Sequence, residues 1–420
     1  MQTSAQKNSV AESHPVQHGL NMDSDVVVVG GGIGGLATAL GLSRAGVTVT
    51  VLEQEPDFHE VGAGLELAPN GTRILRDWGL LDQMSDLGVH PKTLVIKDAV
   101  TGDELTRMEL DGEFEERYGA PYLVAHRGDL LTTLLDAARA AGVTLVTSER
   151  VDSVETTGDT AIVTAASGNS YQGRLVIAAD GLSSTLRSEL SADEPIASGY
   201  VAYRGMVKTD EVEIDADIER VVLYIGPGCH FVQYPIRKAT DGEAALLNQV
   251  AVFQSPAFLR GEEEWGTPDE FDAAFAHCIP EIRHAIGFVP RERHWLMFDR
   301  EPIEEWIAGR MVLTGDAAHP MLQYLAQGAC QAIEDARVLQ STVVRHRRAG
   351  ELDWPAIARD FTSRRSPRTA RVQRNARLWG ESWHVDGVAR MLRNLLFTDR
   401  MKNDYKYTDW LYGKDVVNIT

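Results

Sequence analysis

The chain has 420 residues, a formal net charge of −20 and 44% hydrophobic residues. This length is enough for two or three domains with buried cores. The acidic balance excludes protein classes that need clustered positive charge, so we expect neither nucleic acid nor an anionic membrane surface as a partner. No apolar run approaches the roughly 20 residues that a membrane span requires, so we expect no membrane insertion.

Residues 1–23 are polar and lack the apolar segment of a secretory signal, so we predict a disordered tail. The cysteines, Cys229, Cys278 and Cys330, are odd in number, far apart in the sequence and without metal-ligand spacing. Such a set is typical of a reducing compartment. We therefore expect a cytoplasmic protein without a metal site, and we interpret Cys330 as a small packed residue.

Residues 25–53, DVVVVGGGIGGLATALGLSRAGVTVTVLE, predict a buried strand, a glycine-rich turn, a helix and a second strand. The turn has the GxGxxG pattern. Gly30 allows the tight turn, Gly32 lets the backbone approach a pyrophosphate, and Gly35 lets helix and sheet pack closely. The N-terminus of the helix offers free N–H groups to the phosphates.

Glu53 ends the second strand, where a carboxylate can accept hydrogen bonds from ribose hydroxyls. The same carboxylate repels a 2′-phosphate, so the nucleotide in this cradle is NAD or FAD rather than NADP. No second GxGxxG follows a strand downstream, whereas other glycine-punctuated motifs occur at long range. This combination favours FAD over NAD.

Three later segments combine a charged residue with a predicted turn or helix start. They are HRGDL (126–130), LVIAADGLSSTLR (175–187) and RMVLTGDAAHP (310–320). The last continues as GDAAHPMLQYLAQGACQAIEDA, in which we interpret Glu334 and Asp335 as an acidic face without chemistry.

Residues 196–300 are rich in alternating aromatic and β-branched residues, which predicts antiparallel strands of a second domain. On the strand GCHFVQYP, His230, Val232 and Tyr234 point to one face. A lone strand histidine is more often structural than catalytic. The polar loop LQYLAQG, which contains Gln323, favours a substrate site at His230 and Tyr234 over a purely structural role.

The chain from Arg337 onward is helical in pattern and contains the arginine-rich stretch RRSPRTARVQRNAR (364–377). On an acidic chain we interpret this stretch as a solvated helix face or a dimer interface, rather than a basic nucleotide or membrane patch. Tryptophans and tyrosines within 379–412 can pack at such an interface, so we expect a homodimer.

The GxGxxG unit, HRGDL, the DG motif at 180–181 and the GD motif at 315–316 follow one another along the chain. Together they resemble the motifs of the class A flavoprotein aromatic hydroxylases, which are single-component FAD enzymes. The resemblance covers residues 24–415 and includes VGAGLELAPNGTRIL (61–75). It implies an α/β fold with a Rossmann-like FAD-binding domain of the 4-hydroxybenzoate hydroxylase type, an inserted antiparallel β-sheet substrate domain and C-terminal helices. The implied divisions are a tail (1–23), the FAD-binding domain (24–195, with a small β insertion near 90–118), the substrate-binding sheet domain (196–300), the returning FAD-binding segment (301–345) and a C-terminal helical region (346–420).

The resemblance assigns cofactor contacts to one set of residues. Glu53 would hold the adenosine ribose, and Arg127 would reach the ribityl or pyrophosphate region, although it could be an ordinary surface arginine. Asp180 and Gly181 would serve both FAD and the nicotinamide donor, with Arg187 nearby or only in a salt bridge.

It assigns the flavin ring to a second set. Asp316 would accept a hydrogen bond from a ribityl hydroxyl, and Pro320 would lie against the isoalloxazine. The backbone of Gly328 and Ala329 would face the pyrimidine edge of the ring.

Within this family, HFVQYP, GDAAHPMLQYLAQGA and the tail 388–413 are most similar to enzymes that hydroxylate 3-hydroxybenzoate para to its hydroxyl, giving gentisate. These use NADH and O₂ through a flavin C4a-hydroperoxide. The similarity implies that His230 accepts the phenol proton, Gln323 hydrogen-bonds the substrate and Tyr234 positions it. A neutral histidine with a pKa of about 6.5 can take this proton from a phenol with a pKa of about 10.

Three alternatives remain open from the sequence. The first is a salicylate hydroxylase that makes catechol on the same scaffold. The second is an FAD reductase or oxidase that never hydroxylates, and the third is a non-catalytic FAD-binding regulatory or scaffold protein. Product analysis separates the first two, and the absence of NADH turnover with any phenol identifies the third.

Overall fold

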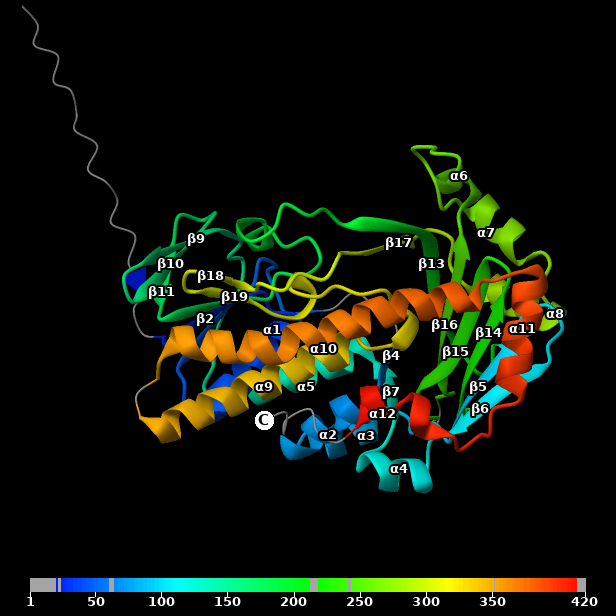
Figure 1. Cartoon of the computed structure of the whole chain (residues 1–420), viewed down its shortest axis with the longest axis horizontal. Coiled ribbons are helices and arrows are strands. Elements are labelled where there is room, and N and C mark those ends of the chain that lie inside the picture. The colour runs from blue at the N-terminus through cyan, green and yellow to red at the C-terminus, as the bar shows by residue number, and fades with distance from the viewer. Residues whose placement is uncertain are drawn as a thin grey trace, which may run out of the picture.

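A computed structural model describes residues 20–21, 24–59, 64–211, 218–239, 243–350 and 352–413. A six-stranded sheet lies at the left of Figure 1 and contains the strand that precedes the glycine-rich turn. Val26–Val29 is buried along its whole length, as expected for a strand with helices on both faces. In spatial order the strands are β18 (Ile307–Ala308), β19 (Met311–Leu313), β12 (Leu175–Ala178), β2 (Val26–Val29), β3 (Val49–Leu52) and β8 (Thr144–Val146).

A seven-stranded sheet lies at the right of Figure 1, at the other end of the molecule from the six-stranded sheet. Its order is β17 (His294–Asp299), β13 (Ile196–Lys208), β16 (Leu246–Gln254), β15 (Cys229–Arg237), β14 (Arg220–Gly226), β5 (Thr93–Asp98) and β6 (Glu104–Glu109).

The seven-stranded sheet differs from the predicted one in two respects. The segment predicted as a small β insertion in the FAD-binding domain forms β5 and β6, which join this sheet. The β5–β14 pair is parallel, so the sheet is not wholly antiparallel. The physical reason is that β5 brings the apolar residues Leu94 and Ile96 onto the same buried surface as Leu223 and Ile225 of β14.

Two smaller sheets complete the β structure. The four-stranded one has the order β1 (Leu20–Asn21), β11 (Ser170–Gly173), β10 (Thr160–Ala165) and β9 (Val151–Thr157). The other pairs β4 (Gly64–Leu67) with β7 (Leu123–His126). The predicted disordered tail therefore differs at Leu20–Asn21, which gain backbone hydrogen-bond partners in β11, and its remaining residues 1–19 and 22–23 lie outside the described part.

The helices pack on both sheets. α9 and α10 lie side by side across the front of Figure 1, and α10 extends from the six-stranded sheet to the seven-stranded one. The helices are α1 (Ile33–Arg44), α2 (Pro69–Asp77), α3 (Leu81–Leu87), α4 (Glu113–Tyr118), α5 (Arg127–Ala140), α6 (Pro256–Leu259), α7 (Pro268–Phe275), α8 (Pro280–Ala285), α9 (Gly328–Ala349), α10 (Trp354–Trp383), α11 (Gly387–Thr398) and α12 (Asp409–Tyr412), with 3₁₀ turns η1 (Leu186–Glu189), η2 (Ile286–Phe288), η3 (Gly315–Ala317), η4 (Gln323–Leu325) and η5 (Tyr405–Tyr407).

The arrangement confirms the predicted α/β fold with a sheet domain and C-terminal helices. Among the described helices, none is both long and apolar enough to cross a lipid bilayer.

Candidate active site

The three glycine-containing motifs meet at one edge of the six-stranded sheet. Strands β2, β12 and β19 are parallel neighbours, so the loops that follow them leave the sheet side by side. A Cβ built at Gly30 would lie only 2.4 Å from the carbonyl oxygen of Ala179, and one built at Gly34 would lie 3.9 Å from the Cα of Gly315. The carboxyl edge of such a sheet is where open α/β folds bind nucleotides.

Packing explains the glycine spacing of the first loop. Gly30 has a φ of +104°, a conformation that residues with a Cβ rarely adopt. A Cβ at Gly35 would overlap the carbonyl oxygen of Gly30 at 1.9 Å. Gly32 caps α1 without a side-chain hydrogen bond, which leaves the first N–H groups of this helix for a ligand.

Glu53 is fixed beside this loop. Its carboxylate accepts hydrogen bonds from the backbone N–H of Gly31 at 2.6 Å and of Glu55 at 2.9 Å. A carboxylate has about four lone-pair positions, so acceptor capacity for ribose hydroxyls is left over. The geometry fits the predicted ribose contact, which stays a prediction.

The loop after β12 contains an unsatisfied carboxylate oxygen. Asp180 Oδ2 accepts a 3.4 Å hydrogen bond from the N–H of Leu186, whereas Oδ1 is buried and has no hydrogen-bond partner among the described residues. Burial raises the pKa of this carboxyl. A buried polar atom without a partner is costly and is often satisfied by a ligand.

Arg187 is a buried structural residue. It donates to the Asp193 carboxylate at 2.9 Å and to the carbonyl oxygens of Ala317 and Ala318 at 3.0 and 2.8 Å. It therefore ties the loop after β12 to the loop after β19. This observation favours the salt-bridge interpretation over a direct cofactor contact.

The loop after β19 presents Asp316 at the surface, while its neighbours are held from below. Asp335 on α9 accepts hydrogen bonds from Thr314 Oγ1 at 3.0 Å and from the N–H of Gly315 at 2.9 Å. It also contacts Nε2 of His319 at 2.6 Å. The loop is thus fixed in a geometry that leaves the Asp316 carboxylate available for a ribityl hydroxyl.

The residues predicted to contact the flavin ring follow directly. Pro320 is buried and its carbonyl accepts from Gln373 at 2.9 Å. Gly328 and Ala329 form the first turn of α9, whose N-terminus has no side-chain cap. Their N–H groups are available to acceptor atoms on a ring edge. Ala326, just before, is one of the non-glycine residues with positive φ, at +51°.

The acidic pair predicted as a face of α9 is instead completely buried. Arg365 of α10 donates to Glu334 and to Asp335, both at 2.6 Å, and Arg368 donates twice to Glu334 at 2.6 Å. We call Glu334, Asp335, Arg365 and Arg368 the ionic clamp. The acidic-face interpretation is wrong because α10 covers this side of α9.

The clamp also corrects the interpretation of the arginine-rich stretch. Arg365 is 1% exposed, and Arg377 is bound to Asp299 at 2.6 Å. These two side chains balance buried acids inside the molecule, whereas Arg371 and Arg374 of the same stretch are exposed, so only part of the stretch is a solvated face. Several aromatic residues assigned to an interface, including Trp383 and Tyr405, are buried as well.

His230 and Tyr234 lie on the face of β15 that is turned toward the loop after β19. The rings of His230 and Tyr324 have centroids 5.6 Å apart, and His230 meets Trp383 edge-on at 5.1 Å. Tyr234 is buried beside its cross-strand partner Asn248, and burial raises the pKa of its phenol. The predicted shared face is therefore present.

His384 is a site residue that the sequence did not indicate. It follows α10, and its Nε2 lies 2.8 Å from Nδ1 of His230, so one ring donates to the other. Burial, and then the charge of the neighbouring His384, lowers the pKa of His230 well below its usual range. Burial also lowers the pKa of His384 to about 3. Both imidazoles are neutral at neutral pH.

Arg204 on β13 is a second unpredicted residue on the same face. It pairs with Val250 of β16, which pairs with Val232, and directly paired residues project to one side of a sheet. Val232 lies between His230 and Tyr234 in β15. The signal for Arg204 was present in GYVAYRGMV, where it is the one charged residue of the stretch.

Arg204 has a neutral hydrogen-bond partner and no acidic one. Its Nη2 donates to Gln323 Oε1 at 2.8 Å, and its guanidinium lies 5.5 Å from the ring centre of Trp295. Within the described part of the chain its Nε is buried without a partner, and no carboxylate forms an ion pair with it. Burial lowers the pKa of Arg204.

Comparison with known proteins agrees with this geometry. A family model described as an FAD binding domain matches residues 23–376. The 3-hydroxybenzoate 6-hydroxylase of Polaromonas naphthalenivorans (strain CJ2) is 36% identical over 402 residues, which cover 94% of this chain and 97% of that protein. The 3-amino-4-hydroxybenzoate 2-monooxygenase PtmB3 of Streptomyces platensis is also 36% identical, with the same two shares.

Among solved structures, a variant of HpxO from Klebsiella pneumoniae complexed with FAD superposes with a TM-score of 0.78 at 26% identity. It covers 90% of this chain and 95% of that one. A salicylate hydroxylase substrate complex shares the fold with a TM-score of 0.77 at 22% identity, covering 94% and 96%. The cradle, the unsatisfied Asp180 oxygen and the uncapped α9 N-terminus fit FAD. The chain belongs to the FAD-dependent aromatic hydroxylases and is an FAD-dependent aromatic monooxygenase.

Proposed function

We propose that this enzyme hydroxylates 3-hydroxybenzoate para to its hydroxyl, giving gentisate, with NADH as electron donor and O₂ as oxidant. The observation that carries the proposal is one face of the seven-stranded sheet that bears both a buried neutral imidazole, His230, and a guanidinium, Arg204, for which the described residues supply no acid. A phenol that also bears a carboxylate matches both groups.

When bound, FAD supplies the redox chemistry, since it accepts a hydride from NADH and activates O₂ for transfer to the ring. The residues named for it are Gly30, Gly32, Gly35, Glu53, Arg127, Asp180, Asp316, Pro320, Gly328 and Ala329. The remaining work, which is to bind, orient and deprotonate the substrate, falls to the protein.

His230 acts as the general base. An aromatic ring attacks an electrophilic oxygen faster as a phenolate, so removal of the phenol proton activates the position para to the hydroxyl. Burial lowers the pKa of His230, so the imidazole is neutral, and with Nδ1 donating to His384 its Nε2 is the acceptor for the phenol proton. The hydrogen bond with His384 fixes the orientation of the His230 ring.

Arg204 binds the substrate carboxylate. A buried cation without an acid is unfavourable, and a benzoate carboxylate removes this cost by forming charge-assisted hydrogen bonds. Gln323, already bonded to Arg204, holds the guanidinium in place and offers its amide N–H to the substrate. Tyr234 lies on the same face and positions the ring.

The test is turnover of the FAD-loaded enzyme with 3-hydroxybenzoate, salicylate and 3-amino-4-hydroxybenzoate in parallel, each with NADH and with NADPH, under ¹⁸O₂. Gentisate with one labelled oxygen, formed with NADH, is the expected result. Catechol from salicylate would assign the alternative salicylate hydroxylase activity. NADH oxidation without labelled product from any of the three would contradict the hydroxylase proposal and favour a reductase or oxidase.

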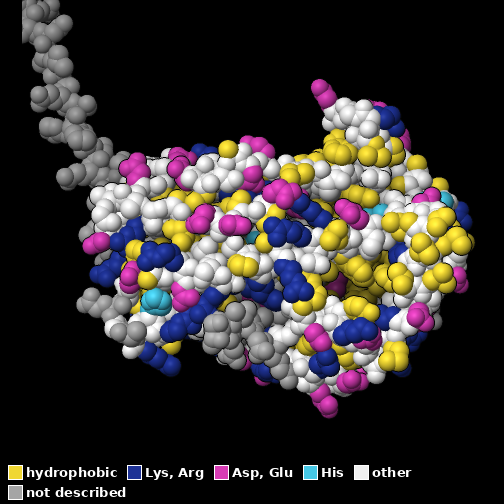
Figure 2. All heavy atoms as spheres, in the orientation of Figure 1, with side chains coloured by type: hydrophobic (Ala, Val, Ile, Leu, Met, Phe, Trp, Pro, Cys, Tyr) yellow, Lys and Arg dark blue, Asp and Glu magenta, His cyan; other side chains and the backbone are white. Residues whose placement is uncertain are grey.

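We also propose a cytoplasmic homodimer. Cys229, Cys278 and Cys330 are free thiols, which supports a reducing compartment. Figure 2 shows a hydrophobic patch over α11, where Val388 and Leu396 are 72% and 73% exposed. Patches of this kind are typical of protein interfaces. Analytical ultracentrifugation of the enzyme and of Leu396→Asp tests it, and a wild-type monomer at micromolar concentration would exclude the dimer.

A further inference from the structure

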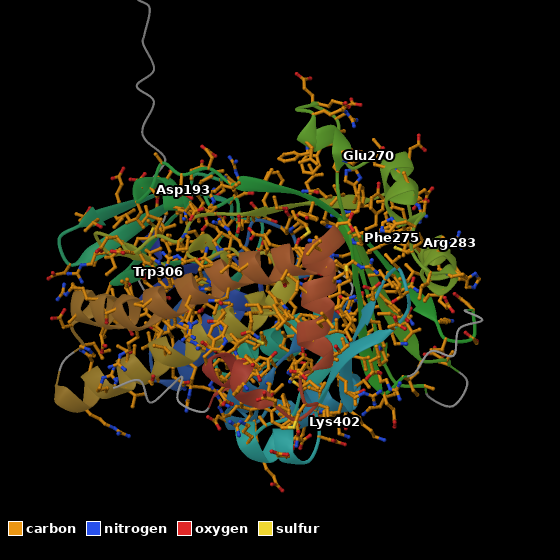
Figure 3. The ribbon with its side chains drawn as sticks, turned by 45° about the vertical axis from the view of Figure 1, so that its right-hand side comes forward. Asp193, Glu270, Phe275, Arg283, Trp306 and Lys402 are labelled. Carbon is orange, nitrogen blue, oxygen red and sulfur yellow. The ribbon has the colours of Figure 1, made fainter. Side chains whose placement is uncertain are left out.

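Three side chains with metal-ligating atoms meet on the face of β15 opposite to His230. Cys229 comes from β15, while His277 and Cys278 come from the loop between α7 and α8. Figure 3 labels Phe275 and Arg283, which flank this loop. The Cys229 and Cys278 sulfurs are 3.7 Å apart, and Nε2 of His277 is 3.9 Å from the Cys229 sulfur.

These separations approach the edges of a tetrahedral metal site. Bonds of about 2.3 Å to sulfur and 2.0–2.1 Å to nitrogen place two sulfurs about 3.8 Å apart, and a sulfur and a nitrogen about 3.6 Å apart. All three ligand atoms of the group lie within 4.8 Å of one another. The His277 side chain is exposed, so a small rotation of it can shorten the longer separation.

We propose that Cys229, His277 and Cys278 bind a thiophilic divalent cation of the zinc class, with a water molecule as fourth ligand on the exposed side. Two thiolates and an imidazole favour such a cation over Mg²⁺ or Ca²⁺, which prefer oxygen ligands. The cysteines are 49 positions apart in the sequence, so the spacing of the chain alone did not indicate the site.

Backbone hydrogen bonds hold the loop that carries His277 and Cys278. The N–H of Ile279 donates to the carbonyl oxygen of Ala99 at 2.9 Å, and the N–H of Cys278 donates to that of Phe275 at 3.1 Å. A bound cation would cross-link this loop to β15, the strand whose other face carries His230. The site is therefore structural, and it does not depend on the substrate proposed above.

Coordination requires the thiols to lose their protons. The thiolate rather than the thiol is the ligand, so the cation must displace one proton from each cysteine. Metal affinity is then expected to fall as the pH falls, with protons released to solvent on binding.

The experiment uses FAD-loaded enzyme that has been reduced, treated with chelator and dialysed. Zn²⁺ is titrated in competition with a chromophoric chelator, and Cd²⁺ is followed by the ultraviolet thiolate-to-cadmium charge-transfer band. One equivalent of each is expected to bind. Loss of a direct ligand in Cys229→Ser or Cys278→Ser should weaken binding at least about 100-fold, more than typical losses of outer-shell partners.

Matched variants separate this site from adventitious binding. Cys330→Ser keeps both proposed thiolates and His284→Asn changes an exposed histidine of α8, so both should retain wild-type affinity. His277→Asn, at the surface, tests the site if a buried cysteine variant fails to fold. The proposal is overturned by sub-stoichiometric binding, by unchanged affinity in the cysteine and His277 variants, or by a Cys229–Cys278 disulfide in freshly isolated enzyme.

Discussion

Two arginines, the buried Arg365 and the partly buried Arg204, lie in very different electrostatic surroundings. Arg365 in the ionic clamp contacts two carboxylates at 2.6 Å and the side chain of Gln331 at 2.8 Å. Arg204, on the sheet face that also bears His230, has one hydrogen bond to the neutral Gln323, and the described residues give it no acid. Both side chains are guanidinium groups, but only Arg365 has acidic hydrogen-bond partners among the described residues.

This difference separates a structural charge from a charge that awaits a ligand. The clamp is complete without cofactor or substrate, and it holds the loop that carries Asp316 through the bond from Gly315 to Asp335. The sheet face that bears Arg204 and His230 is incomplete, since it carries a guanidinium without an acid among the described residues and a neutral imidazole. The contrast predicts that clamp variants lose stability, whereas variants at Arg204 and His230 lose activity.

The largest effect is expected for Arg365→Met. This change leaves Glu334 and Asp335 buried without their shared cation, which costs about 3–5 kcal/mol of the free energy of unfolding. Urea unfolding followed by tryptophan fluorescence measures it. Arg374→Met, on the exposed side of the same helix, should stay within about 0.5 kcal/mol of wild type. Equal losses in the two variants would contradict the structural role of the clamp.

The clamp also predicts a loss of stability in acid. Burial opposes ionisation of Asp335, but His319, Arg365 and the N–H of Gly315 together lower the pKa of its carboxyl below the ordinary value of 3.8. The folded state therefore binds protons less readily than the unfolded chain. The contribution is fully present at neutral pH and is lost as the pH falls below about 4. Unfolding midpoints at pH 7, 5, 4 and 3 test the sign, and Arg365→Met should show a weaker dependence.

Replacement of the proposed base, His230→Ala, should affect chemistry and leave FAD content unchanged. Loss of a general base lowers the hydroxylation rate by about 100- to 10,000-fold, while NADH oxidation stimulated by substrate continues and yields H₂O₂. Product and peroxide are quantified together in one assay. A variant that still forms product at the wild-type rate would refute the assignment, whatever its NADH consumption.

Arg204→Met sharpens the comparison between the two arginines. Loss of the carboxylate partner should weaken the binding free energy of 3-hydroxybenzoate by about 2–5 kcal/mol, which raises its dissociation constant roughly 30- to 4,000-fold. The free energy of unfolding should not fall. Binding of 3-hydroxybenzamide, which lacks the charge, should change far less. Arg293→Met, which removes an exposed guanidinium over the same Trp295 ring, is the control. Equal weakening of acid and amide would argue against a carboxylate contact.

The nucleotide side could be predicted from the sequence because its geometry is local. The turn at Gly30, the helix after it and the strand that ends just before Glu53 lie within 29 consecutive residues, and steric limits on glycine make the pattern specific. Parallel pairing then brings the later motifs to the same edge. The hydrophobic run in β2 indicated a strand buried on both faces, but its pairing with β12 is known only from the structure.

The proposed substrate side could be predicted only in part. The alternation in β15 identified the face shared by His230 and Tyr234, since strand geometry is also local. The contact with His384 joins residues 154 positions apart and depends on the length of α10, which no short pattern encodes. Burial of Glu334 likewise depends on which helix covers α9, and composition alone favoured solvent.

The smallest effect is expected at the cradle, for Glu53→Ala. The variant loses the carboxylate that accepts a hydrogen bond from the N–H of Gly31 and that is predicted to bind the ribose. The binding free energy of FAD should weaken by about 1.5–3 kcal/mol, which raises its dissociation constant roughly 10- to 150-fold. Quenching of flavin fluorescence by the apoenzyme measures it, with the exposed Glu55→Ala as control. Because the cradle is held by glycine packing as well as by this carboxylate, the unfolding free energy without FAD should change little. Purification of Glu53→Ala with full flavin content and wild-type affinity would show that the glycine loop alone retains the nucleotide.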